Sequence, residues 1–258
     1  EYMLVCTAYE LGMDDRIAML ESYMESHPDT RYANRIQSLI ASSYFFDGEY
    51  MKAIACYKGC DFDALNNEER EDNIFRLAQS YLKIGNNEEA SAWFKALQAV
   101  GSRYDDDATY NIAYIDYTQG RYDSALKGFE QVLHSKEYAS LSPYYIADIY
   151  LINGNAGKAR GMAEQYLSEY PSSDKRTQME RIAGEAAYAQ KDYRAATGYL
   201  DKYCSGEEKP SRNALYKLGM SYFNTQVYSK AAEYLGRTTT QKDEMTQNAY
   251  LNMGLAYL

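Results

Sequence analysis

The chain has 258 residues and a formal net charge of −10, with 27 Lys and Arg against 37 Asp and Glu. This acidity argues against nucleic acid as a partner, because binding to phosphates depends mainly on Lys and Arg. A hydrophobic content of 46% excludes disorder, no apolar run approaches the roughly 20 residues that membrane insertion needs, and the length allows about one or two domains.

Only 4 Pro in a chain with 29 Tyr favour a mostly helical structure with few rigid turns. One pattern recurs with a period of 34 to 37 residues: an Ala, preceded twelve positions earlier by a small residue. The Ala positions are Ala53, Ala90, Ala125, Ala159, Ala196 and Ala231. The small positions are Ala41, Ala78, Ala113, Ala147, Gly184 and Gly219, and Gly254 opens a further unit.

Each recurrence predicts a pair of amphipathic helices. Apolar and small residues at spacings of three and four form one face of a helix, and a Gly such as Gly48 or Gly85 ends it cheaply in the left-handed conformation. The recurring Ala lies where the two helix backbones must approach closely. Because one pair cannot bury its own apolar faces, neighbouring pairs must stack.

These residues resemble the tetratricopeptide repeat, a helix–turn–helix unit of about 34 residues. The resemblance implies an all-α solenoid of antiparallel helix pairs that form a right-handed superhelix, as a single array over residues 1–258. We expect a degenerate first repeat over 1–33, full repeats that start near 34, 71, 106, 140, 177 and 212, and a partial repeat over 247–258. Arg16 replaces Ala in the first repeat, and Lys191 and Gln226 replace the turn Gly in the last two full repeats.

In the family that this chain resembles, the first helices of successive repeats line a concave groove that binds peptides or protein segments. Its register assigns to the groove the positions three and two before the small residue and one, four and five after it. We expect the partner site among an aromatic belt and the polar residues beside it: Tyr110, Asn111, Tyr114, Tyr117, Tyr144, Tyr145, Asp148, Arg181, Glu185, Tyr188 and Tyr216. Tyr suits such a site because it combines a large apolar body with a hydroxyl, although Tyr also packs between helices elsewhere in this chain.

Other features of the sequence favour structural over chemical roles. Cys56 and Cys60 lie four residues apart, which predicts thiols that fill one helix face. The acids between Asp61 and Asp72 are expected in a solvated inter-repeat loop, with a site for a basic partner as the alternative. Asp105 and its two acidic neighbours are expected to cap a helix rather than hold a metal. With two remote histidines and no oriented base beside a nucleophile, we expect no enzyme, no cofactor and no metal.

We therefore expect a non-enzymatic scaffold that binds a protein or peptide in its groove. The alternatives are a cell-envelope assembly or biogenesis subunit that acts through its convex face or ends, and a regulatory module attached to an enzyme or sensor. The segment Tyr166–Ser173 resembles repeats of bacterial envelope members, which favours the periplasm, with the cytoplasm as the alternative. The chain stops inside a helical pattern, so we expect a piece of a longer protein. Met253, Leu255 and Leu258 are expected on a helix without a following partner, which stacks end to end with another copy or frays.

Overall fold

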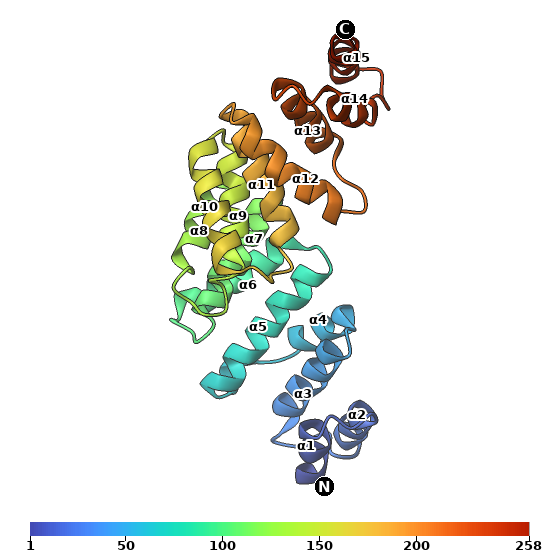
Figure 1. Ribbon diagram of the computed structural model, residues 1–258. Helices are drawn as coiled ribbons and strands as arrows, with labels where there is room; N and C mark the ends of the chain where they lie inside the picture. Colours follow the sequence, from blue (N-terminus) through green and yellow to red (C-terminus); the bar gives the residue numbers. More distant parts are fainter. Residues whose placement is uncertain (258) are drawn as a thin grey trace. The chain divides into compact units, whose positions relative to one another are not determined.

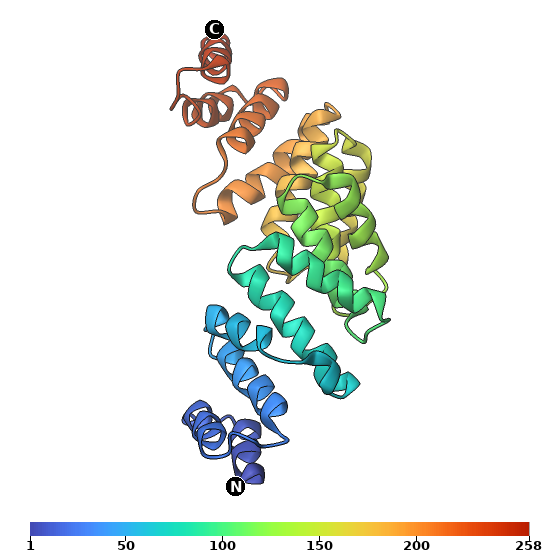
Figure 2. The same cartoon turned by 180° about the vertical axis from the view of Figure 1, so that it is seen from behind.

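In the computed structural model, which describes residues 1–257, every regular element is helical. The chain divides into two compact units, Glu1–Gly128 and Phe129–Leu258, and α8 (Tyr122–Gln131) crosses the division. Whether one array continues through both units stays a prediction. Within each unit, the helices follow one another as pairs joined by tight turns (Figure 1), and the view from behind shows the same succession (Figure 2).

The first unit is built from three helix pairs, a further first helix and the start of α8. First helix α3 contacts both α1 and α5, and each of the three also contacts its own second helix. The helices of the first unit are α1 (Tyr2–Glu10), α2 (Arg16–Ser26), α3 (Ala33–Phe46), α4 (Tyr50–Lys58), α5 (Asn67–Lys83), α6 (Asn87–Ala99) and α7 (Asp105–Thr118), with a short 3₁₀ turn η1 (Phe62–Ala64) before α5.

The second unit repeats this arrangement. Its first helices α9, α11, α13 and α15 contact their neighbours in turn, so each second helix lies between two first helices. The helices of the second unit are α9 (Ser142–Ile152), α10 (Ala156–Glu169), α11 (Arg176–Ala189), α12 (Tyr193–Gly206), α13 (Arg212–Asn224), α14 (Tyr228–Gly236) and α15 (Glu244–Ala256). Leu258, which was expected on the last helix, lies outside the described residues.

The recurring positions are buried in each pair. All six recurring Ala residues have no exposed surface, and Ala41, Ala78, Ala113 and Ala147 are buried as well. Where the small residue is Gly, the facing residue is large: a Cβ added to Gly184 would lie 2.6 Å from Leu200 Cγ, and one added to Gly219 would lie 2.8 Å from Leu235 Cγ. At these two contacts, the absence of a side chain on one helix makes room for a Leu on the other.

The turns inside the pairs keep one geometry even where Gly is absent. Gly48 and Gly85 adopt φ values of +77° and +78°, and the residues that replace Gly, Lys191 and Gln226, adopt φ of +62°. A left-handed backbone costs a residue with a Cβ roughly 1–2 kcal/mol. Stacking thus imposes the turn on Lys191 and Gln226 against their own preference.

The structure corrects the expected loop between the second and third repeats. The α5 helix begins at Asn67 because the Asn66 side chain caps it, accepting a hydrogen bond from Glu69 N at 2.9 Å. Glu68, Glu69, Glu71 and Asp72 are therefore helical, and only the region around Asp61 and η1 remains a loop. Acidic side chains in the first turn of a helix stabilise it, because they interact favourably with the helix dipole.

The structure also differs in part from the expected roles of Asp105 and of the cysteine pair. Asp105 lies in the first turn of α7 after the N-cap Tyr104, so it favours the dipole without acting as the cap. Helix α4 ends at Lys58, so Cys60 lies beyond it, and Cys56 and Cys60 are half-buried rather than buried. No helix in residues 1–257 is long and apolar enough to cross a membrane.

Candidate functional site

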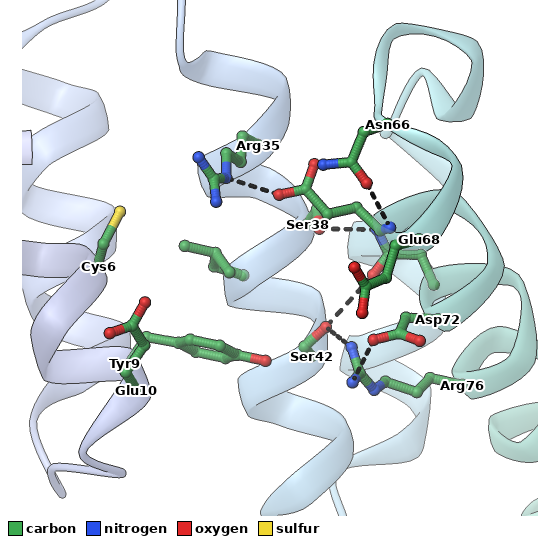
Figure 3. A pocket seen from close by; sticks show the side chains of 13 residues that line it. Cys6, Tyr9, Glu10, Arg35, Ser38, Ser42, Asn66, Glu68, Asp72 and Arg76 are labelled. Carbon is green, nitrogen blue, oxygen red and sulfur yellow. Dashed lines mark hydrogen bonds and ion pairs between the residues drawn. The ribbon is translucent and has the colours of Figure 1, made fainter.

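The first helices of the first unit enclose a polar groove. It lies between α1, α3 and α5 and has a volume of about 420 Å³ (Figure 3). The lining side chains come from all three helices and from the cap before α5. They are Cys6, Tyr9, Glu10, Arg35, Ser38, Leu39, Ser42, Asn66, Glu68, Glu69, Asp72, Asn73 and Arg76.

A buried hydrogen-bond network forms the floor of this groove. Asn73 donates to Ser38 Oγ at 2.7 Å, and Ser42 Oγ lies 3.0 Å from the Tyr57 hydroxyl and 3.1 Å from Arg76 Nη1. Burial raises the pKa of Tyr57, so its hydroxyl stays protonated. Buried polar groups are costly unless they are paired, and here each is paired across α3, α4 and α5. The floor is therefore a fixed polar surface.

Ion pairs hold the wall that α5 contributes. Arg35 Nε lies 2.8 Å from Glu69, and Arg76 lies 3.2 Å from Asp72. From the turn before α7, Arg103 contacts Asp72 and lies 2.9 Å from Glu68. These contacts place acidic residues of α5 at the groove.

The wall that α1 contributes is different, because the polar groups of Tyr9 and Glu10 have no partner among the described residues. Tyr9 extends from α1 toward α3 in Figure 3, and no described residue hydrogen-bonds to its hydroxyl. Glu10 lines the groove without an ion pair in the described part of the chain. Tyr9 and Glu10 also line a second hollow, of about 480 Å³, with Gly12, Asp14, Arg16, Phe46 and Asp47. Arg16 contacts Asp47, whereas Asp14 has no described partner. The two hollows thus share an unpaired carboxylate.

Four of the predicted site residues lie on α7 of the first unit. Asn111 is buried and donates from Nδ2 to the Asp107 carbonyl at 2.7 Å, so it serves its own helix. Tyr110, Tyr114 and Tyr117 are half-buried, and Tyr117 packs edge-on against Tyr122 with ring centres 6.0 Å apart. The belt that these tyrosines were predicted to form with α9 stays a prediction.

In the second unit, the predicted polar residues join into a chain of ion pairs. Arg181 Nη2 lies 2.7 Å from Asp148, Arg181 Nη1 lies 3.3 Å from Glu185, and Glu185 accepts from Lys217 Nζ at 2.5 Å. Burial lowers the pKa of Arg181, but Glu185 and Asp148 raise it by more, so the net pKa lies above its usual range. The side chains of Asp148 and Glu185 are only 10% and 7% exposed. These charges therefore connect α9, α11 and α13.

The predicted tyrosines of the second unit make ring contacts. Tyr145 stacks on Phe129 at 4.7 Å and meets Tyr144 edge-on at 5.0 Å. Tyr188 packs against Tyr193, and burial raises its pKa, with Tyr216 close enough to add to the shift. These rings serve packing and remain half-exposed.

Sequence reasoning found part of the groove and missed part. The register assigned Ser38, Leu39, Ser42 and Arg76 to the groove, and all four line it. It stopped three residues before the small position, and so missed Asp72, which lies one turn earlier on the same helix face.

Metal ligands and reactive thiols are not gathered in the described part of the chain. No group of three or more His, Cys, Asp or Glu in residues 1–257 is placed to hold a metal ion. All four cysteines are free, and burial raises the pKa of Cys60 to about 12 and of Cys204 to about 11. Thiols with raised pKa values are poor nucleophiles at neutral pH.

Comparison with known proteins gives consistent results. Models of one family, described as tetratricopeptide repeat, match residues 75–140, 110–174 and 213–241. No curated protein sequence matches the chain. Among solved structures, the C-terminal part of a tetratricopeptide-repeat protein from Cytophaga hutchinsonii aligns with a TM-score of 0.69 at 15% identity, over 96% of this chain and 99% of that one.

Two further structures share the fold. PilF of Pseudomonas aeruginosa aligns with a TM-score of 0.63 at 16% identity, over 85% of this chain and 97% of that one. A repeat protein from Parabacteroides merdae aligns with a TM-score of 0.58 at 15% identity, over 100% and 99%. At these identities the likeness shows the fold alone, and it confirms the helical-repeat architecture expected from the sequence.

Proposed function

This chain belongs to the tetratricopeptide-repeat family, and on that premise we propose that it is a non-enzymatic scaffold that binds a peptide or protein segment along the faces of its first helices. Proteins with this repeat serve as interaction scaffolds. The observation that carries the proposal is the polar groove between α1, α3 and α5, which first helices alone line apart from the cap residue Asn66.

The construction of the groove supports binding rather than packing. Its floor is hydrogen-bonded and fixed, so a partner would meet a preorganised surface and lose less conformational entropy on binding. Polar groups on the α1 side are available to an extended segment. Neither unit brings together a nucleophile, a base and an orienting group among its described residues, which favours binding over catalysis.

Crosslinking mass spectrometry of the full-length protein in its own cell lysate tests this function. A carboxylate-reactive crosslinker distinguishes the faces, because Glu10 on α1 and Glu68 on α5 lie at the groove, whereas Glu88 and Glu89 lie on the second helix α6. We expect partner peptides to link to the first pair of acids. Links confined to α6 and other second helices would instead indicate the convex-face function and overturn the proposal.

We also propose that the tyrosines of α7 and α9 take part in partner binding. Aromatic residues with a polar tip are enriched among binding hot spots, where truncation costs about 2 kcal/mol or more. The double variant Tyr114→Ala/Tyr145→Ala should therefore weaken binding of the crosslinked partner while it keeps its helicity. Unchanged affinity in a variant with native far-UV circular dichroism would remove the belt from the site.

Self-association through the ends is a separate proposal. Leu251 and Leu255 on α15 are 62% and 49% exposed, and Met3 and Leu4 on α1 are exposed as well. Burying these side chains against a second copy would be favourable by about 25 cal/mol per Å². Sedimentation velocity should show a concentration-dependent dimer that Leu251→Glu abolishes, whereas a monomer at all concentrations would contradict the proposal.

A further inference from the structure

The net negative charge of this protein lies entirely on its first unit. Residues 1–128 hold 22 Asp and Glu against 12 Lys and Arg, whereas residues 129–258 hold 15 of each. The net charge of −10 therefore belongs to the unit that contains the groove, and the second unit is neutral. Such a field attracts cationic partners and repels anionic ones over about 10 Å at ordinary ionic strength.

The same bias appears at the groove itself. The groove and the hollow that adjoins it are lined by six carboxylates and three arginines. Arg103 does not line either, but it contacts two of the carboxylates as a fourth cation. The carboxylates are Glu10, Asp14, Asp47, Glu68, Glu69 and Asp72. Arg16, Arg35 and Arg76 are each already bonded to one of these acids. The groove is thus left with acceptor capacity and no unpaired cation among its described residues.

We propose that the α1–α3–α5 groove recognises a basic peptide segment, with a lysine or arginine side chain placed between the α1 wall and the α5 wall. This inference rests on the proposed function and names the chemistry of its partner. The carboxylates of Glu10 and Asp14 have no described partner and supply the contacting charge. The unbonded Tyr9 hydroxyl supplies an acceptor, and the buried, hydrogen-bonded Ser42 and Asn73 fix the floor beneath it.

The geometry disfavours an acidic segment or a free carboxyl terminus in the same place. A carboxylate would need a cation that can leave its present partner, yet Arg76 Nη1 and Nη2 are committed to Ser42 and Asp72, at 3.1 and 3.2 Å. Removing Arg76 from Asp72 would leave that carboxylate with Arg103 as its one remaining cation and place the incoming carboxylate beside it. A cation can instead form an ion pair with the unpaired carboxylates, and no existing ion pair has to break.

End-blocked peptide pools test this proposal on the full chain. The pools are acetylated and amidated nonapeptides with mixed flanking positions and a central residue fixed as Arg, Lys, Gln or Glu, and binding is measured by fluorescence anisotropy. We expect the Arg and Lys pools to bind about tenfold more tightly than the Glu pool at low salt, and the difference to shrink as added salt screens the charges.

Two charge-matched variants locate the effect. Glu10→Gln/Asp14→Asn removes the unpaired acid of the groove, at the end of α1, and the unpaired acid of the adjoining hollow, in the turn that follows. Glu25→Gln/Asp29→Asn removes the same charges at the end of α2 and in its following turn, outside both hollows. We expect the first variant to lower the affinity for the Arg pool roughly fivefold, which is the combined effect of losing two exposed ion pairs. The second variant should change this affinity less than twofold.

Alkylation of Cys6 independently reports where the peptide binds. Cys6 lines the groove, whereas Cys204 belongs to the second unit. The Arg pool should slow maleimide alkylation of Cys6 and leave Cys204 unchanged. Equal binding of the Glu and Arg pools, equal effects of the two double variants, or no binding by any pool would overturn the basic-segment proposal. The scaffold function is tested separately, by the crosslinks to Glu10 and Glu68, and none of these outcomes would contradict it.

Discussion

Replacing Gly184 with Ala tests whether close helix contacts set the repeat sequence. Gly184 lies on α11 where α12 crosses it, and an added Cβ would lie 2.6 Å from Leu200 Cγ, 2.9 Å from its Cδ2 and 3.1 Å from its backbone nitrogen. Carbon atoms prefer separations of about 3.5–4.0 Å. Because Cγ and N are near the main chain, Leu200 cannot avoid the clash by rotating its tip, and α12 must move.

The magnitude follows from a matched control. Gly198 lies inside α12 with no atom within 4 Å of its added Cβ, so Gly198→Ala should stabilise the chain by roughly 0.8–1.0 kcal/mol through helix propensity alone. Gly184→Ala receives the same gain but also overpacks the contact, at roughly 1–3 kcal/mol. The two variants should therefore differ by about 2 kcal/mol, with Gly184→Ala the less stable.

Urea denaturation followed by far-UV circular dichroism measures this difference. Hydrogen exchange of α11 and α12 supplements it, since repeat arrays do not always unfold in one step. Adding Leu200→Ala to the Gly184→Ala chain should cost less than Leu200→Ala alone, because the new methyl then fills part of the cavity. If Gly184→Ala proves as stable as Gly198→Ala, the close-contact reasoning is wrong.

Three further predictions concern turns and titrating groups. Lys191→Gly and Gln226→Gly should each stabilise the chain by about 0.5–1 kcal/mol in urea unfolding, because they relieve a left-handed φ of +62°, whereas Gln119→Gly, at φ −95°, should destabilise it. Burial raises the pKa of many tyrosines, so their contribution to stability is complete below about pH 10 and is lost as the pH rises through the raised folded values. Absorbance at 295 nm should therefore show a higher midpoint for the native chain than in guanidinium, and identical curves would contradict this. The hydrogen bond from Arg212, with that from Thr246 N, lowers the pKa of Asp243, so docking of α15 is complete above about pH 3.9 and weakens as the pH falls through the lowered folded value. Asp243→Asn should reduce hydrogen-exchange protection of α15 at neutral pH, and protection equal to wild type would exclude this role.

The fold could be predicted because its signal is periodic. Ala53 and its equivalents recur at one position of successive repeats, and they are completely buried. The turn conformation followed from the Gly positions and extended to Lys191 and Gln226, where composition gave no sign of it. The start of α5 was placed too late, because a single cap at Asn66 adds a turn that the repeat register does not contain.

The groove could be predicted only where the register applied. Ser42 and Arg76 occupy regular positions and were found, but Tyr9 and Glu10 belong to a first repeat too degenerate to supply a register. The acids of α5 were visible in the sequence, yet their placement depended on where the helix began. The cap at Asn66 thus determines that these acids belong to a helix that lines the groove and not to a loop.

The ion pairs of the first helices determine which residues can report on binding. A residue one position after the small residue accepts a hydrogen bond from the next first helix: Ser42 from Arg76 at 3.1 Å, Asp148 from Arg181 at 2.7 Å, and Glu185 from Lys217 at 2.5 Å. Arg181→Ala would remove the cation that Asp148 and Glu185, two buried carboxylates, share, which typically costs several kcal/mol. It would therefore weaken binding by loosening the array, whatever the partner. Only side chains outside this chain of contacts separate recognition from stability, and Glu10 and Asp14 meet that condition because no described residue holds them.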